Sequence, residues 1–290
     1  MFSRTNKKTD VKLITPFDPW KNSLCSCAAK YSLSAYTGCS HGCIYCYASG
    51  YVRNFWQPRE KKYFLARLQK DLPALDKNST IAMANSSDPY QPMEKKLRLT
   101  RQALRLLAER GARILLVTKS DLIARDLDIF RGYKKIVAAL TIATMDKNLA
   151  AKLEPGAPEP DKRLKALEKL AKHIPVICRV DPLFYGINTG GIPELLTRLK
   201  NCGCRQITVS TYKSRPDNFS RVTKVFPQLK KIYLEQGEKI GNSTYLGKDL
   251  RKKLLDLVSG QAKTIGLRFA ACREGLEKNT CSCDGADFLR

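Results

Sequence analysis

Three cysteines in one short segment are the strongest chemical signal in the sequence. Cys39, Cys43 and Cys46 have the spacing C-x3-C-x2-C in a glycine-containing loop directly after a predicted strand. Three thiolates can bind three irons of a [4Fe–4S] cluster and leave the fourth iron open to another ligand. A structural zinc site that takes a fourth cysteine from elsewhere is the alternative. His41, inside the loop, is expected to be a loop residue rather than a ligand.

The other cysteines are unevenly distributed. Cys25 and Cys27 form a C-x-C pair before the first predicted strand, and Cys272, Cys281 and Cys283 lie in a polar segment near the end of the sequence. No signal peptide is recognisable, and the cytosol keeps thiols reduced, so metal binding is expected rather than disulfides. The distribution therefore indicates two metal sites. The remaining cysteines, one expected in the core and two in a turn of undecided role, are Cys178, Cys202 and Cys204.

Short apolar segments alternate with amphipathic ones, a pattern typical of βα units with a parallel sheet. Six such units can form an open, curved barrel whose site lies at the carboxyl ends of the strands. The expected fold class is therefore α/β, a partial (β/α)6 barrel of the TIM type with a small C-terminal extension. The predicted strands are residues 31–36, 80–85, 113–118, 135–142, 175–180 and 206–210, with a further one at 264–270. The predicted helices are residues 94–109, 163–172, 192–201 and 248–258.

Three regions follow from this pattern. Residues 1–30 form an N-terminal extension with the C-x-C pair, residues 31–213 form the barrel core, and residues 214–290 form a C-terminal extension.

The charge and hydrophobicity exclude several classes of protein. With 52 Lys and Arg against 27 Asp and Glu, the formal net charge is +25, unlike the surface of an ordinary neutral metabolic enzyme. The chain is also 43% hydrophobic, which excludes a disordered basic protein. Because no run of about 18 apolar residues occurs, a soluble, cytoplasmic protein without a membrane partner is expected.

Residues 51–64, directly after the cysteine loop, contain the densest mixture of aromatic and basic side chains. Basic groups neutralise phosphates and exposed aromatic rings stack on unpaired bases, so this segment is the best candidate for contact with a nucleic acid. The alternative is a partly buried segment that leads into a helix and carries solvated charges.

Several motifs resemble those of radical S-adenosylmethionine (radical SAM) enzymes, and more narrowly the proteins related to spore photoproduct lyase. The resemblance runs from about Leu24 to Tyr212 and is carried by the cysteine loop and by SSDPYQPMEKK, VTKSDL, TIATMD, EPGAP and RVDPL. It implies a [4Fe–4S] cluster, S-adenosylmethionine bound at its open iron, and electron transfer that yields a 5′-deoxyadenosyl radical. An electron donor such as flavodoxin or ferredoxin is implied as a partner.

The resemblance also implies roles for residues near the carboxyl ends of the strands. Cys39, Cys43 and Cys46 would hold the cluster. The residues expected to bind the cofactor are Ser86, Ser87, Asp88, Lys119, Thr141, Thr144 and Arg179. Each has a structural alternative: Asp88 can form a turn, Lys119 can be a solvated turn lysine, and Arg179 can serve a structural ion pair.

Tyr45 and Tyr47 match the tyrosines that flank the last cluster cysteine in the lyase, where the second is thought to relay the radical. The lyase has a hydrogen-donating cysteine where this sequence has Asn85. Since an amide does not readily donate a hydrogen atom, repair of spore photoproduct by the lyase's own route is doubtful.

The terminal cysteines are the second candidate metal site. Some radical SAM enzymes carry an auxiliary iron–sulfur cluster, and four of Cys25, Cys27, Cys272, Cys281 and Cys283 would suffice to bind one. A zinc site and uncoordinated thiols are the alternatives.

The sequence is compatible with three functions. The first is a radical SAM enzyme that acts on a nucleic acid. The second is a radical SAM enzyme with a protein or small-molecule substrate. The third is a metal-stabilised nucleic-acid-binding protein without turnover.

Overall fold

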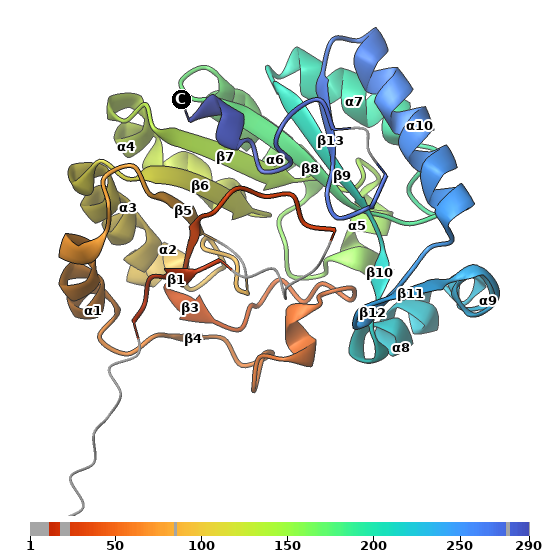
Figure 1. The fold of residues 1–290 in the computed structure, drawn as a ribbon, viewed down its shortest axis with the longest axis horizontal. Coiled ribbons are helices and arrows are strands. Elements are labelled where there is room, and N and C mark those ends of the chain that lie inside the picture. The colour runs from red at the N-terminus through yellow and green to blue at the C-terminus, as the bar shows by residue number, and fades with distance from the viewer. Residues whose placement is uncertain (1–11, 18–23, 84–85, 277–278, 290) are drawn as a thin grey trace, which may run out of the picture.

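A curved sheet of eight strands forms the centre of the structure, a computed structural model that describes residues 12–17, 24–83, 86–276 and 279–289 (Figure 1). Its strand order is β1-β2-β5-β6-β7-β8-β9-β13, and only β1 runs antiparallel to its neighbour. The strands are β1 Thr15–Pro16, β2 Tyr31–Leu33, β5 Thr80–Met83, β6 Arg113–Thr118, β7 Ile136–Thr141, β8 Val176–Leu183, β9 Gln206–Thr211 and β13 Arg268–Ala271. Because β1 and β13 are opposite edges, the barrel is open, which confirms the predicted partial barrel.

Helices cover one face of this sheet. Alternate strand residues such as Ile81, Ile114 and Ile136 join the large core that the helices bury. These side chains are apolar, and their β-branched shape fits the pleat of the sheet. The helices along the chain are α1 Phe64–Asp71, α2 Glu94–Leu97, α3 Leu99–Arg110, α4 Leu127–Gly132, α5 Lys147–Leu153, α6 Pro160–Ala171, α7 Ile192–Asn201 and α10 Lys248–Thr264.

The C-terminal segment covers part of the opposite, concave face. Leu289 packs with Ala82, Leu115, Val137 and Ile177, which alternate with the helix-facing residues along their strands. Every residue of β7 is therefore buried, as expected for a parallel strand covered on both faces. Figure 1 shows this segment in dark blue near the label of the C-terminus.

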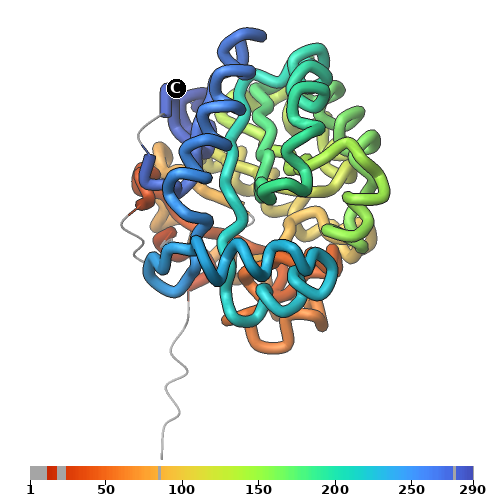
Figure 2. Tube along the Cα trace, turned by 90° about the vertical axis from the view of Figure 1, so that its right-hand side faces the viewer, coloured from red at the N-terminus to blue at the C-terminus, as the bar shows by residue number. Residues whose placement is uncertain are grey.

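A smaller unit lies at the lower end of the molecule in both views (Figures 1 and 2). It contains the helices α8 Pro216–Val225 and α9 Gln228–Gln236 and the strands β10 Lys213–Ser214, β11 Glu238–Ile240 and β12 Ser243–Tyr245, which form a three-stranded antiparallel sheet. Within the described residues, no helix is long and apolar enough to span a lipid bilayer.

Several predicted elements differ from the observed ones. The strand predicted at 31–36 ends at Leu33, and the chain then forms β3 Tyr36–Thr37, which pairs with β4 Arg59–Glu60 in a separate small sheet. The helix predicted at 94–109 is interrupted at Arg98, whose φ of 54° is left-handed. The tail strand begins later than predicted, because α10 continues to Thr264, and β13 joins the main sheet beside β9. Asn85 lies outside the described residues.

Candidate functional site

The cysteine loop is fastened to the carboxyl ends of the central strands by hydrogen bonds. The Ser87 hydroxyl, after β5, donates to the Gly38 carbonyl over 2.6 Å, and the Gln91 amide donates to the same carbonyl over 3.1 Å. On the other side, the Ile44 N–H donates to the Leu153 carbonyl at the end of α5 over 3.0 Å. Because these contacts satisfy the backbone of a loop that has no secondary structure of its own, they fix its position.

The EPGAP segment that follows α5 lies directly against this loop. The Gly156 N–H donates to the His41 carbonyl over 2.8 Å. A Cβ atom added to Gly156 would lie 2.2 Å from the Ser40 carbonyl oxygen, so a side chain does not fit here. The glycine of this motif therefore permits close approach of two backbones.

The three thiols of the loop lie close enough to interact through their charges. Cys43 is buried, whereas Cys39 and Cys46 are half-buried. Burial raises the pKa values of the Cys43 and Cys46 thiols, while the nearby Lys119 ammonium group lowers both. Burial lowers the pKa of Lys119, but the negative charges of Cys43, Glu154 and Asp88 raise it overall, so Lys119 stays a cation. The loop thus has a positive charge next to it that favours thiolates.

Neither the cysteine loop nor the group of terminal cysteines has its side chains arranged as metal ligands. In the described part of the chain, no three His, Cys, Asp or Glu side chains already form a set that could hold a metal ion. The thiols of each group therefore have to turn toward a shared metal before they bind it.

Asp88 is bound by groups from three elements. Its carboxylate accepts hydrogen bonds from the Tyr90 N–H (2.8 Å), the Thr118 hydroxyl (2.6 Å) and the Lys119 N–H (2.8 Å). Its Oδ2 also lies 3.4 Å from Nδ1 of His41. Burial alone would raise the pKa of Asp88, but His41 and these donors lower it to about 2. Asp88 therefore joins the turn after β5 to the end of β6.

His41 has a partner that the sequence analysis did not predict. Its side chain is buried and hydrogen-bonds Cys39, and Asp88 raises its pKa to about 10 although burial lowers it. Among the described residues, its Nδ1 has no well-aligned hydrogen bond. His41 is consequently a buried cation beside the cysteines, a role that its position in a loop did not indicate.

Several of the other residues predicted to bind the cofactor already form hydrogen bonds or ion pairs with protein groups. Ser87 both donates to Gly38 and accepts from Gln91 over 2.9 Å, and Thr144 accepts from the Asp146 N–H over 3.1 Å. Arg179 forms an ion pair of 2.8 Å with Asp181, as the structural alternative predicted. Thr141 is buried, and Ser86 is half-buried.

The two predicted tyrosines have different surroundings. The Tyr45 hydroxyl donates to Glu154, whose other carboxylate oxygen accepts from Arg163. Tyr47 instead stacks on Tyr51, with ring centroids 6.3 Å apart. Burial raises the pKa of Tyr47 to about 12, and the charges that also act on it are Cys46, Arg273, Asp181 and Arg179.

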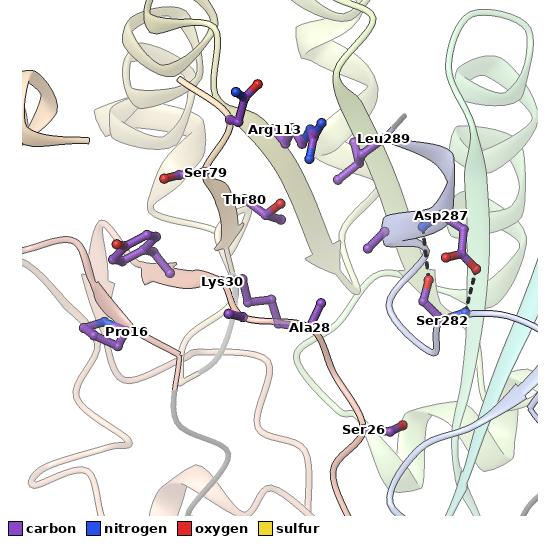
Figure 3. A pocket seen from close by; sticks show the side chains of 14 residues that line it. Pro16, Ser26, Ala28, Lys30, Ser79, Thr80, Arg113, Ser282, Asp287 and Leu289 are labelled. Atoms are coloured by element: carbon purple, nitrogen blue, oxygen red, sulfur yellow. Dashed lines mark hydrogen bonds between the residues drawn. The ribbon is translucent and has the colours of Figure 1, made fainter. Parts of the chain in front are cut away.

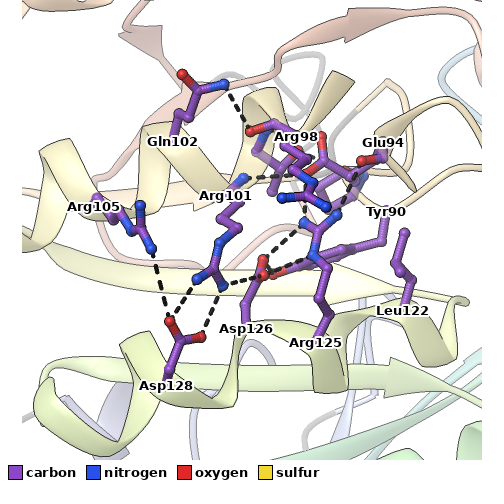
Figure 4. Close-up of polar contacts among 12 residues, drawn as sticks. Tyr90, Glu94, Arg98, Arg101, Gln102, Arg105, Leu122, Arg125, Asp126 and Asp128 are labelled. Atoms are coloured by element: carbon purple, nitrogen blue, oxygen red, sulfur yellow. Dashed lines mark hydrogen bonds and ion pairs between the residues drawn. The ribbon is translucent and has the colours of Figure 1, made fainter. Parts of the chain in front are cut away.

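A buried ionic network supports the SSDPYQPMEKK segment (Figure 4). Arg125 donates to Glu94 over 2.7 Å and to Asp126 over 2.8 Å, and Tyr90 donates to Asp126 over 3.0 Å. Arg101 completes the charge balance with a 2.8 Å contact to Asp126. This network could not be recognised in the sequence, although the motif itself contains Tyr90 and Glu94. Because Glu94 and Asp126 are fully buried, the network holds the segment that supplies Asp88.

The structure brings together four of the five terminal cysteines. The sulfurs of Cys27 and Cys283 are 3.6 Å apart, Cys272 hydrogen-bonds Cys283, and Cys25 hydrogen-bonds Cys27. Cys281 does not take part, because its thiol donates to the Phe269 carbonyl over 3.4 Å. Of the remaining cysteines, Cys178 lies within β8 and is buried, as predicted for a core residue, Cys204 is also buried, and Cys202 is half-buried.

Comparison with known proteins agrees with the motifs. An uncharacterised protein of Methanocaldococcus jannaschii is 36% identical over 164 residues, which cover 55% of this chain and 61% of that relative. Spore photoproduct lyase complexed with dinucleoside spore photoproduct has a similar structure, with a TM-score of 0.63, 18% identity, and coverage of 83% of this chain and 75% of that one. A lyase variant with bound AdoMet and dinucleoside spore photoproduct is similar to the same degree. Its TM-score is 0.63 at 19% identity, and the match covers 86% of this chain and 78% of that one.

These structural matches establish the fold. The family model of the radical SAM superfamily covers residues 33–199, more than half of the chain, and includes the cysteine loop and the strands around it. The predicted resemblance is thereby confirmed, and the chain belongs to the radical SAM superfamily of enzymes.

Proposed function

We propose that this chain cleaves S-adenosylmethionine reductively and uses the radical on a nucleic acid. The observation that carries the proposal is the C-x3-C-x2-C loop of a radical SAM family member, held at the carboxyl ends of parallel strands with Lys119 beside it. When bound, a [4Fe–4S] cluster supplies the electron that cleaves the cofactor to methionine and a 5′-deoxyadenosyl radical. A donor such as flavodoxin or ferredoxin would reduce it.

The residues of the loop fit such a cluster. Cys39, Cys43 and Cys46 provide three sulfur ligands, the number that leaves one iron open. The Lys119 ammonium group and the His41 cation offset the negative charge that three thiolates bring into a largely buried loop.

Lys119 is the stronger candidate for binding the cofactor's carboxylate. Arg179 already pairs with Asp181, and Asp88 is occupied by donors from the protein. Lys119 has negative neighbours but also lies next to the cysteines, where an added carboxylate would form a charge-assisted contact. Ser86, Ser87, Thr141 and Thr144 then shape the binding site, and Asp88 positions the backbone of Lys119.

Tyr47 is the stronger candidate for a radical relay. The Tyr45 hydroxyl is committed to Glu154, so it would have to break a buried hydrogen bond to give up its hydrogen atom. Tyr47 interacts electrostatically with Cys46 of the loop, and its ring stacks on the exposed ring of Tyr51.

The same surface supports a nucleic-acid substrate. Residues 51–64 expose Tyr51 (46%), Trp56 (47%) and Tyr63 (82%), while Phe55 and Phe64 of this segment are buried. The segment also leads into α1, and its buried phenylalanines agree with the structural alternative, so the proposal rests on the three exposed rings. Exposed rings next to the cysteine loop can stack on bases, and the net charge of +25 attracts phosphates.

The chemistry is tested by forming 5′-deoxyadenosine with reduced, iron-reconstituted protein. The Cys39→Ala, Cys43→Ala and Cys46→Ala variants should form none, whereas Cys202→Ala, a cysteine outside both groups, should retain the activity. Equal product from all four variants would contradict the assignment of the loop.

The substrate is tested separately with deuterium-labelled oligonucleotides. Transfer of deuterium into 5′-deoxyadenosine is expected, together with binding that weakens steeply as salt is raised. Product formation without deuterium transfer or oligonucleotide binding would leave the radical chemistry intact and refute the nucleic-acid substrate.

At the terminal cysteines, a second iron–sulfur cluster and its alternative, a zinc site, both stay predictions. The proposed reaction requires only the cluster of the loop.

A further inference from the structure

Four thiols from opposite ends of the sequence meet at the open side of the barrel. Cys25 and Cys27 precede β2, Cys272 follows β13, and Cys283 lies in the segment that covers the concave face. Thiol–thiol hydrogen bonds join them in the order Cys25, Cys27, Cys283, Cys272. No cysteine of this set belongs to the loop that the proposed function uses.

The separation of the sulfurs distinguishes between two kinds of metal site. With Zn–S bonds of 2.3 Å, two sulfurs of a tetrahedral zinc site are about 3.8 Å apart. The Cys27 and Cys283 sulfurs are 3.6 Å apart. In a [4Fe–4S] cluster each thiolate binds a different iron, so the ligand sulfurs stand on opposite sides of the cluster and do not touch.

The cysteine loop provides a comparison within the same protein. Among the described contacts, no thiol–thiol hydrogen bond joins Cys39, Cys43 and Cys46, although their charges interact. The terminal thiols are thus joined by direct contacts, as neighbouring ligands of a single ion are, although they still have to turn toward the ion, whereas the loop thiols interact through their charges only.

We propose that Cys25, Cys27, Cys272 and Cys283 bind one zinc ion as a structural tetrathiolate site, without Cys281. A closed set of four cysteine thiolates is typical of structural zinc sites, and such a site also binds Zn²⁺ more tightly than Fe²⁺. The site goes beyond the proposed function, which does not depend on it.

Positive groups surround the four sulfurs. The buried Lys30 hydrogen-bonds Cys27 and forms an ion pair with Asp284, next to Cys283. Arg179 interacts electrostatically with Cys272 and Cys283, and Arg273 with Cys272. Four thiolates and Zn²⁺ carry a net charge of −2, and cations that donate hydrogen bonds to the sulfurs stabilise such a centre.

A zinc ion here would close the open side of the barrel. The N- and C-terminal segments lie on either side of a cavity of about 580 Å³, and the ion would bridge them beside it (Figure 3). Cys27 and Cys283 are 256 positions apart, so the ion would close nearly the whole chain into a loop and restrict the unfolded state strongly. The labelled cavity residues from these segments are Pro16, Ser26, Ala28, Lys30, Ser282, Asp287 and Leu289.

The test uses the full chain in which Cys39, Cys43 and Cys46 are all replaced by alanine. Metal analysis of this protein, purified with zinc available, should give one zinc per chain and no sulfide. Adding Cys27→Ala or Cys283→Ala should abolish tight zinc binding, whereas adding Cys281→Ala should not. Failure of the radical chemistry does not affect this readout.

A second measurement does not require the variants to fold. In the wild-type protein loaded with zinc, alkylation followed by mass spectrometry should find the four proposed ligands protected and Cys281 modified. Four irons with sulfide at this site, a disulfide between Cys27 and Cys283, or alkylation of all five thiols alike would each overturn the proposal.

Discussion

Replacing Gly156 by alanine tests whether the EPGAP segment holds the cysteine loop in place. The new Cβ would lie 2.2 Å from the Ser40 carbonyl oxygen and 3.1 Å from the His41 carbonyl group. Real Cβ atoms do not approach other heavy atoms within 3.0 Å, so the two backbones have to separate by at least about 0.8 Å. Since Gly156 does not have a left-handed φ, the variant tests close approach alone.

The separation affects both stability and metal binding. It stretches the 2.8 Å hydrogen bond from Gly156 to His41 and moves the backbone between Cys39 and Cys43. Overpacking of this kind costs about 1–3 kcal/mol. In a protein of this size, the melting temperature should fall by about 2–12 °C. The displaced loop should also take up less iron on reconstitution.

The assay is thermal unfolding of the metal-free protein followed by iron analysis of the reconstituted one. Gly132→Ala is the control, because nothing lies within 4 Å of a Cβ added there, and its melting temperature should stay within about 2 °C of wild type. If Gly156→Ala melts and binds iron like wild type, the segment does not position the loop.

Single substitutions at Arg125, Asp88 and Trp56 test three other features of the structure. Arg125→Met should lower the free energy of unfolding by about 3–5 kcal/mol in a denaturant titration, because Glu94 loses its buried partner. The exposed control Arg105→Met should lower it far less, and equal losses would refute the network. The pKa of Asp88 is lowered from 3.8 to about 2, so its charged form stabilises the fold above pH 4, and this contribution is lost as the pH falls through 2. Asp88→Asn should therefore remove about 2 kcal/mol from the loss of unfolding free energy between neutral and acid pH. An unchanged pH dependence would contradict the pairing. Trp56→Ala should weaken binding of a single-stranded oligonucleotide about 5- to 150-fold, measured by fluorescence anisotropy, with Leu234→Ala on α9 as the neutral control; no difference between the two would exclude stacking at Trp56.

The sequence sufficed to predict the elements that carry a clear pattern. The central strands are short, rich in β-branched residues and followed by polar turns, so their positions along the chain and the open barrel could be predicted. Strands of two residues, such as β1 and β10, contain too few positions to show alternation. The break at Arg98 was also invisible, because arginine has no preference for a left-handed φ.

The site was predictable only where its residues are close in sequence. The three cysteines of the loop lie within eight residues, so their spacing is visible in the sequence. In contrast, the bonded residues Tyr45 and Glu154 are 109 positions apart, and Glu94 and Arg125 are 31 apart. Charged residues of this kind look like solvated side chains until the fold buries them together. Which four of the five terminal cysteines meet is likewise decided by the path of the chain, which turns Cys281 toward the Phe269 carbonyl.

The most direct test of the central claim is the yield of 5′-deoxyadenosine from the reduced, reconstituted protein with S-adenosylmethionine. Wild-type protein should form it, and the Cys46→Ala variant should give only the background seen without protein. A yield from Cys46→Ala equal to that of wild type, or no product from a wild-type protein that contains four irons per chain in the loop, would contradict the assignment of Cys39, Cys43 and Cys46 to radical chemistry.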